Sequence, residues 1–194
     1  AFVSHRTPDR TQSGDQVCKQ FQTLLRFRIA LYDLFRTATH FTPERDRRPM
    51  TVFLDDLGRW DDESYGTYEV TEAEILEFAE RYDPQWFHTD PDRAADSIYG
   101  DLIASGWHTA AMSMRLFVDG FLGETATLGA KGLDRLRWPK PVVPGDELTV
   151  HSTIEGVAEE TEDYGVVRWG VETTANDGAK TVLAIEALVL VATE

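Results

Sequence analysis

Hydrophobic positions from residue 66 onward follow first a strand-like and then a helical period. Residues 66–70, read GTYEV, are typical of a short strand, and residues 72–82 place their apolar side chains on one helical stripe. A capping-box pattern that begins at Thr71 predicts the start of this helix. Its end is predicted at Asp83, because the residue before a proline, here Pro84, is pushed out of the helical conformation.

Two more helices are expected after this one. Asp90 and Pro91 are typical of an N-cap and a first helical position, which predicts a short helix within residues 89–96. A longer and mostly apolar segment covers residues 105–123, with Ser105 as its N-cap. Because apolar side chains occur all around this segment, we expect a long helix that is largely buried.

After residue 130 the pattern becomes that of successive strands. Turn residues separate four segments that read as strands, at residues 133–142, 146–157, 165–175 and 180–193. Four strands on short links predict a largely antiparallel sheet. The expected fold class is therefore α+β, with the long helix lying against one face of the sheet.

The charge of the chain divides it into two parts. Residues 1–49 hold nine basic and five acidic residues, a net +4, whereas residues 50–194 hold 10 basic and 29 acidic residues, a net −19. We therefore interpret residues 1–49 as an N-terminal extension outside the functional domain, which covers residues 50–194. So many carboxylates disfavour nucleic-acid binding and indicate a surface adapted to high salt, although an ordinary acidic protein has the same composition.

The cysteine content and the hydropathy of the chain indicate the cellular compartment in which the protein is expected. The chain has one cysteine, Cys18, which cannot form an intrachain disulfide and is compatible with a reducing cytoplasm. No apolar run approaches the roughly 20 residues that span a bilayer. We therefore expect a cytoplasmic protein without membrane contact.

The segment RYDPQWFHTD, residues 81–90, carries the candidate chemistry. Asp83 and His88 could form an acid/base pair, but they could equally be a helix end and a structural histidine. Ser105 and Gly106 open the long helix, whose free N–H groups suit an oxyanion, although a plain helix cap explains them as well. Together these residues supply an acid, a base and an oxyanion-binding group.

Other functional motifs are missing or ambiguous. The sequence has no Walker-type phosphate loop, no Gly-x-Gly-x-x-Gly fingerprint and no nucleophile elbow, and its histidines lack the spacing of a metal site. His108 could line the site or be structural. Trp86, Phe87 and Trp107 could line an acyl pocket or only pack in the core.

The segment from Asp83 to Met112, together with residues 136–148, resembles the MaoC-like dehydratase family, the (R)-specific enoyl-CoA hydratases of the hot-dog fold. The family motif Asp-x-Asn-Pro-x-His here reads DPQWFH: the Asp and the His keep their spacing, Gln85 falls where Asn is common, and Trp86 replaces the proline. In this fold a long central helix is wrapped by an antiparallel sheet.

The resemblance implies hydration of 2-enoyl-CoA thioesters to 3-hydroxyacyl-CoA. Asp83 and His88 would be catalytic, and the substrate would be bound by Gln85, Ser105, Gly106 and Trp107. No metal and no cofactor is implied, since coenzyme A enters as part of the substrate, and the expected partner is a second copy in a homodimer. Arginines such as Arg135, Arg137 or Arg168 would have to offset the acidic surface near the phosphates of coenzyme A.

Two other functions stay open at this point. A hot-dog thioesterase shares the fold but hydrolyses the thioester bond. A non-catalytic acyl-thioester-binding subunit would require Asp83 and His88 to lie too far apart to share one water molecule.

Overall fold

The computed structural model describes residues 51–60 and 62–194. The predicted extension over residues 1–49 lies outside these residues. The elements are, in chain order, η1 (Leu54–Trp60), β1 (Glu63–Glu69), α2 (Glu72–Tyr82), α3 (Trp86–Thr89), α4 (Pro91–Ala95), α5 (Gly106–Gly120), η2 (Leu122–Glu124), β2 (Thr127–Arg137), β3 (Glu147–Glu160), β4 (Tyr164–Ala175) and β5 (Lys180–Ala192).

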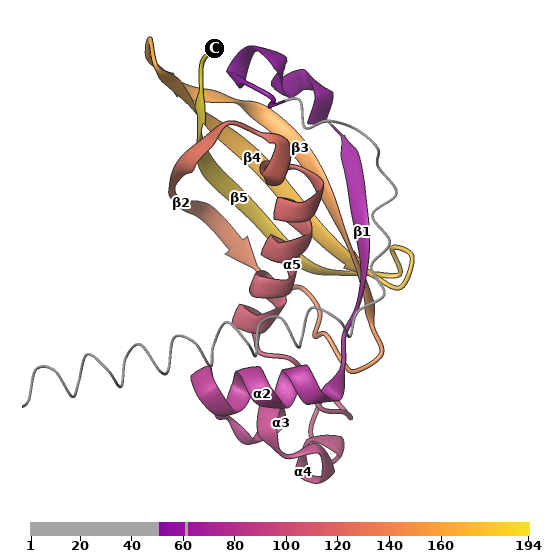
Figure 1. Cartoon of the computed structure of the whole chain (residues 1–194). Helices are drawn as coiled ribbons and strands as arrows, with labels where there is room; N and C mark the ends of the chain where they lie inside the picture. The colour runs from indigo at the N-terminus through magenta and orange to yellow at the C-terminus, as the bar shows by residue number, and fades with distance from the viewer. Residues whose placement is uncertain (1–50, 61) are drawn as a thin grey trace, which may run out of the picture. The chain divides into compact units, whose positions relative to one another are not determined.

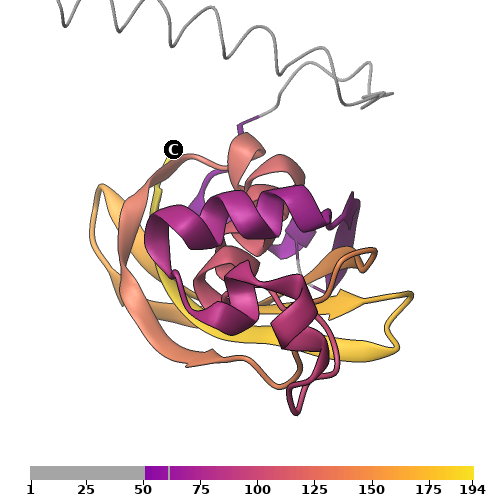
Figure 2. The same ribbon diagram turned by 90° about the horizontal axis from the view of Figure 1, so that it is seen from below.

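One five-stranded sheet in the order β1-β3-β4-β5-β2 forms the main layer, and every neighbouring pair is antiparallel. The helix α5 lies along one face of this sheet (Figure 1). Seen from below, the sheet curves around α5, and α2 and the short helices α3 and α4 lie at the viewer's end (Figure 2). This arrangement is the α+β hot-dog architecture that the sequence predicts.

The core lies between α5 and the sheet. Phe117 of α5 and Trp169 of β4 are fully buried, and their rings meet edge to face with centroids 5.1 Å apart. Burying aromatic surface of this size contributes about 2–3 kcal/mol for each side chain. The indole N–H of Trp169 donates to the hydroxyl of Ser152, so this large polar-edged ring is buried without an unsatisfied donor.

Local signals predict the helix boundaries well. Thr71 caps α2 by accepting a hydrogen bond from the Glu74 N–H, and Asp90 caps α4 by accepting one from the Arg93 N–H. Ser105 caps α5 as expected. The single-turn helix α3 was not predicted, because a four-residue helix has no apolar period to reveal it.

Two expectations about packing are wrong. Helix α5 is buried on one face only: Trp107, Met114 and Val118 are 60%, 46% and 39% exposed. A helix on a single sheet buries only the side that faces the sheet, whatever the composition of its other side.

The strand expected at residues 133–142 instead spans Thr127–Arg137 and pairs with β5. Pro139 and Pro141 explain why it stops, since proline cannot donate a hydrogen bond to a sheet.

No helix of residues 51–60 and 62–194 is long and apolar enough to cross a membrane.

His108 joins α5 to α2. Its ring is stacked on that of Phe78, with centroids 4.6 Å apart and an angle of 7° between the planes. The side chain is buried, and its Nδ1 has no hydrogen-bond partner. Burial lowers the pKa of His108 to about 4, because the protonated ring would lose its water.

This burial predicts a pH-dependent stability. The contribution of neutral His108 to the free energy of unfolding is fully present above the unfolded pKa of about 6.5. It is lost as the pH falls towards 4, since over this range the unfolded chain binds the proton and the folded chain does not. His108→Leu should remove this dependence. Between pH 8 and pH 5 we expect the wild-type free energy of unfolding to fall by about 1–2 kcal/mol more than that of the variant, allowing for solvent screening at the ring edge.

Urea unfolding at a single salt concentration measures both proteins at both pH values. The comparison at pH 8, where His108 is neutral in either state, is the control for the lost packing. Equal pH dependence in the two proteins would show that His108 is not the group responsible.

Candidate active site

Asp83 lies where α2 ends. Its backbone N–H donates to the carbonyl of Ala79 at 2.9 Å, which closes the last turn, and Pro84 then turns the chain away. The carboxylate accepts two hydrogen bonds of 2.7 Å, one at Oδ2 from the hydroxyl of Ser105 and one at Oδ1 from the side-chain amide of Gln85. The Ser105 hydrogen bond is the main reason why the pKa of Asp83 is lowered, so this group is an ionised acceptor near neutral pH.

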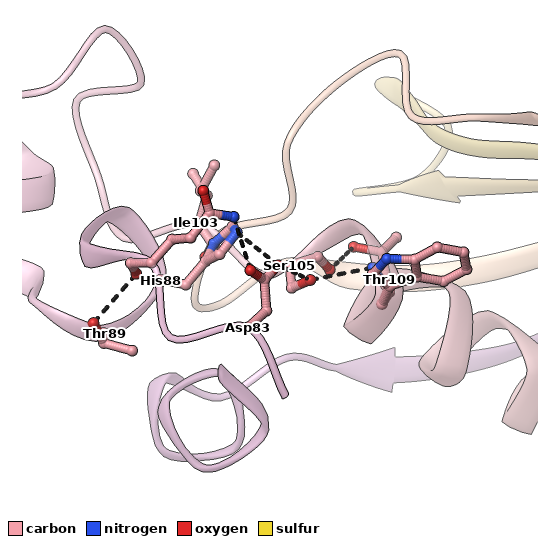
Figure 3. A network of polar contacts seen from close by, with 8 residues as sticks. Asp83, His88, Thr89, Ile103, Ser105 and Thr109 are labelled. Carbon is pink, nitrogen blue, oxygen red and sulfur yellow. Dashed lines mark hydrogen bonds and ion pairs between the residues drawn. The ribbon is translucent and has the colours of Figure 1, made fainter. Parts of the chain in front are cut away.

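His88 approaches the same carboxylate from α3. Its side chain is buried, and its Nδ1 lies 2.7 Å from the backbone carbonyl oxygen of Ile103 (Figure 3). A carbonyl oxygen can only accept, so we assign the hydrogen of the neutral ring to Nδ1. The other nitrogen, Nε2, then carries a lone pair and faces Asp83 Oδ2 at 3.5 Å.

The pair therefore consists of two acceptors that face one another. Two lone pairs at 3.5 Å cannot satisfy each other, but they can accept the two hydrogens of one small donor. A water molecule held in this way would direct an oxygen lone pair away from both residues. Asp83 and His88 thus form an arrangement suited to activating water.

Ser105 has two roles at the start of α5. Its hydroxyl oxygen accepts a hydrogen bond from the Trp107 N–H at 3.3 Å while its hydrogen is donated to Asp83. The residue is 1% exposed, so both bonds are protected from water. With the Trp107 N–H occupied, the N–H of Gly106 at the first helical position has no acceptor within the helix.

Gly106 is also required by its neighbour. A Cβ atom at this position would lie 2.7 Å from the indole ring of Trp138, which is shorter than any normal contact. The sequence predicts Gly106 as part of a helix start that suits an oxyanion. The contact with Trp138 requires glycine at this position, and no local sequence signal could have revealed it.

A cavity of about 410 Å³ lies over these groups. Its lining includes all six residues that were predicted to be catalytic or substrate-binding, namely Asp83, Gln85, His88, Ser105, Gly106 and Trp107. Three further residues were considered as possible lining residues, and only one of them lines the cavity. Phe87 lines the cavity, whereas Trp86 lies beneath the guanidinium of Arg93 at 4.4 Å and His108 packs on α2, so neither belongs to the lining.

Sequence reasoning missed several parts of the site. The Ile103 carbonyl that fixes His88 is a backbone group, which residue types do not reveal. Trp138 and Lys140 line the cavity from a segment that was expected to be strand. The proline on either side of Lys140 was the available signal that this segment is not a strand.

Comparison with known proteins places the chain in a family. Residues 61–176 match the model of the MaoC like domain. The 3-hydroxyacyl-thioester dehydratase Z of Mycobacterium tuberculosis is 34% identical over 124 residues, which cover 62% of this chain and 81% of that protein. The uncharacterized protein YdeM of Bacillus subtilis is 36% identical over 81 residues, which cover 41% of this chain and only 57% of YdeM.

Solved structures give the same result. The MaoC-like dehydratase from Rhodospirillum rubrum superposes with a TM-score of 0.64 at 35% identity, covering 74% of this chain and 98% of that one. The R-hydratase PhaJ1 from Pseudomonas aeruginosa superposes with a TM-score of 0.57 at 22% identity over 74% of this chain and 87% of that one, and this likeness supports the hot-dog fold alone. On the match of residues 61–176, this chain belongs to the MaoC-like domain family.

Proposed function

We propose that this protein catalyses the reversible hydration of 2-enoyl thioesters to 3-hydroxyacyl thioesters. The observation that carries the proposal is the separation of 3.5 Å between Asp83 Oδ2 and His88 Nε2, two acceptors that face each other in one cavity. The names of relatives support the reaction class, since they include a 3-hydroxyacyl-thioester dehydratase at 34% identity and a MaoC-like dehydratase at 35% identity. Coenzyme A is the expected carrier of the acyl group.

The reaction begins with a water molecule that donates one hydrogen bond to each acceptor. His88 Nε2 takes a proton from this water as its oxygen forms a bond to C3 of the enoyl group. The electrons of the C2=C3 double bond move towards the thioester carbonyl and form an enolate. The imidazolium of His88 then returns the proton to C2, so that one molecule of water has been added in total.

Asp83 acts in this scheme as a fixed acceptor. Its lowered pKa makes it a poor source of protons near neutral pH, so His88 is the residue that both takes and returns the proton. Asp83 holds the second hydrogen of the water and stabilises the imidazolium that forms beside it. Gln85 and Ser105 keep the carboxylate in place.

The start of α5 stabilises the negative charge of the enolate. Gly106, the first residue of α5, lines the cavity, so its N–H and the positive end of the helix dipole are near the place where the thioester oxygen would gain charge. Loss of one such donor typically costs about 3–4 kcal/mol of activation free energy. None of these steps requires a metal ion or a redox cofactor.

The alternatives differ from this scheme in what they require. A non-catalytic binding subunit needs no convergence of Asp83 and His88, yet these residues lie within reach of one shared water. A thioesterase would release a free thiol and leave the double bond intact. The two outcomes can be read in a single assay.

Substitution of the pair tests the proposal. With crotonyl-CoA at high salt, which screens the repulsion between the acidic domain and the substrate, wild-type protein should remove the enoyl absorbance. Asp83→Asn and His88→Gln should each lower kcat by at least about 100-fold, because the first replaces the charged carboxylate by a neutral amide and the second replaces the imidazole base by an amide that cannot take the proton. Ser105→Ala should fall between wild type and Asp83→Asn, since the pKa of Asp83 then loses the largest cause of its lowering.

The control is His151→Gln, which changes a histidine that is held by Ser64 and Thr174 outside the cavity and should leave turnover unchanged. Thermal unfolding of each variant separates lost chemistry from lost folding. Full hydration by both Asp83→Asn and His88→Gln would disprove the site assignment, and release of thiol with the double bond intact would establish a thioesterase.

We further propose that the protein works as a homodimer. The exposed face of α5 carries an apolar stripe of Trp107, Ala111, Met114 and Val118. The ring of Trp107 contacts that of Trp138, the residue after β2, with centroids 5.5 Å apart, so this end of the stripe lies next to the end of β2. Strand β2 is an edge of the sheet and is exposed along nearly all its length. A second copy can pair with this edge and cover the stripe, which accounts for both exposed features.

Sedimentation velocity tests the dimer. Wild-type protein should sediment as a dimer, and Met114→Glu should shift it towards monomer, because a charge is placed in the covered stripe. Val157→Glu is the matched control, since Val157 is equally exposed, at 48%, but lies on β3 outside the stripe. A monomeric wild-type protein, or a dimer that Met114→Glu leaves intact, would contradict this interface.

A further inference from the structure

The basic side chains of the described domain are unevenly engaged. Residues 50–194 hold only 10 basic residues among 29 acidic ones. Among the residues that the structure describes, the following basic side chains form ion pairs with carboxylates: Arg115 with Asp119, Lys131 with Glu159, Arg135 with Glu186, Arg168 with Asp134 and Glu186, and Lys180 with Asp146. In a chain with so many carboxylates, a basic side chain that has no carboxylate partner is a candidate for binding an anionic ligand.

Lys140 is such a cation, and it lies at the active-site cavity. It is the single Lys or Arg among the residues that line this cavity, its side chain is exposed, and it forms no ion pair with any described residue. Arg137, three residues earlier and outside the cavity lining, is also exposed, and its guanidinium donates to the carbonyl of the adjacent Leu136 at 2.7 Å. Two positive groups without a carboxylate partner among the described residues therefore lie close together in this segment.

The backbone that carries Lys140 is held firmly. Pro139 and Pro141 on either side fix their own φ angles, which limits the conformations open to Lys140. The carbonyl of Val142 accepts a hydrogen bond from the Ala104 N–H at 2.8 Å, and the carbonyl of Pro141 accepts one from the Lys180 ammonium at 3.2 Å. The segment is thus tied both to the residues that precede α5 and to β5.

We propose that Lys140, assisted by Arg137, binds a phosphate of the carrier that brings the acyl thioester to the cavity. The inference rests on the proposed function, because a thioester bound over Gly106 must extend its carrier arm out of the same cavity. An ammonium group is a compact point charge well suited to phosphate. The ligand chemistry is a phosphopantetheine phosphate, which occurs both in coenzyme A and on acyl carrier proteins, or the additional phosphate of coenzyme A.

This assignment changes which cations oppose the acidic surface. The sequence pointed to Arg135, Arg137 and Arg168 together. Arg135 and Arg168 are engaged by Glu186 and by Asp134, which leaves Arg137 from that group. We assign the main phosphate contact to Lys140 because this residue lines the cavity.

Equilibrium binding tests the inference without relying on turnover. Isothermal titration calorimetry at low salt compares four probes: coenzyme A, dephospho-coenzyme A, 4′-phosphopantetheine and pantetheine. Wild-type protein should bind coenzyme A more tightly than pantetheine, and Lys140→Gln should weaken coenzyme A binding by about threefold to tenfold, the range expected for an exposed charged contact. Arg137→Gln should have a smaller effect in the same direction.

The matched control is Lys131→Gln, which removes the same charge from a lysine that is paired with Glu159 and lies outside the cavity lining. It should leave all four affinities at their wild-type values. Addition of about 1 M NaCl should reduce the preference of wild-type protein for the phosphorylated probes, since salt screens the contact.

The probes also distinguish the carriers. A loss in Lys140→Gln that appears already with 4′-phosphopantetheine assigns the contact to the phosphate shared by coenzyme A and carrier proteins. A loss that appears only between coenzyme A and dephospho-coenzyme A assigns it to the 3′-phosphate of coenzyme A. Equal binding of coenzyme A by wild type, Lys140→Gln and Arg137→Gln would overturn the inference.

The hydration assay is read separately. Absence of hydration in wild-type protein, together with phosphate-dependent binding that Lys140→Gln weakens, would reject the proposed reaction and retain the phosphate site.

Discussion

The hydrogen bond between Ser105 and Asp83 is the interaction on which the rest of the site depends. At 2.7 Å it joins the end of α2 to the start of α5, two elements that the chain separates by more than 20 residues. Pro84 forces α2 to end at Asp83, and the same serine hydroxyl caps α5. A single side chain therefore caps the long helix, holds one oxygen of the carboxylate and is the main cause of the lowered pKa of Asp83.

His88 completes this arrangement through a backbone group. The carbonyl of Ile103 takes the hydrogen of Nδ1, which leaves Nε2 as an acceptor opposite an ionised carboxylate. Either residue alone would be an ordinary polar side chain beside a helix. In the proposed reaction their role comes from the mismatch between them, since two acceptors at 3.5 Å are satisfied by a donor with two hydrogens and not by each other.

Local chemistry explains which parts could be predicted from the sequence. Caps at Thr71, Asp90 and Ser105, and the proline at position 84, act within a few residues, so the helix starts and the end of α2 were predicted correctly. The spacing of Asp83 and His88 likewise lies within one short segment. The structure brings these two residues and the four predicted substrate-binding residues around one cavity.

Contacts between distant segments explain what could not be predicted. The exposed side of α5 depends on which face meets the sheet, and the packing of Trp138 on Gly106 depends on how the segment after β2 folds back over the helix. Lys140 belongs to the same segment. Its proposed role rests on the absence of an ion pair with any residue that the structure describes, and composition cannot reveal this in a chain so rich in carboxylates.

Hydration of crotonyl-CoA in D2O, with the product analysed by NMR, tests the central claim most directly. If Asp83 and His88 hold one water and His88 delivers the proton from the side on which the water attacks, the 3-hydroxybutyryl product should carry one deuterium at C2, in a single one of the two positions. Deuterium distributed equally over both C2 positions, or an intact enoyl acid beside free thiol, would contradict the account.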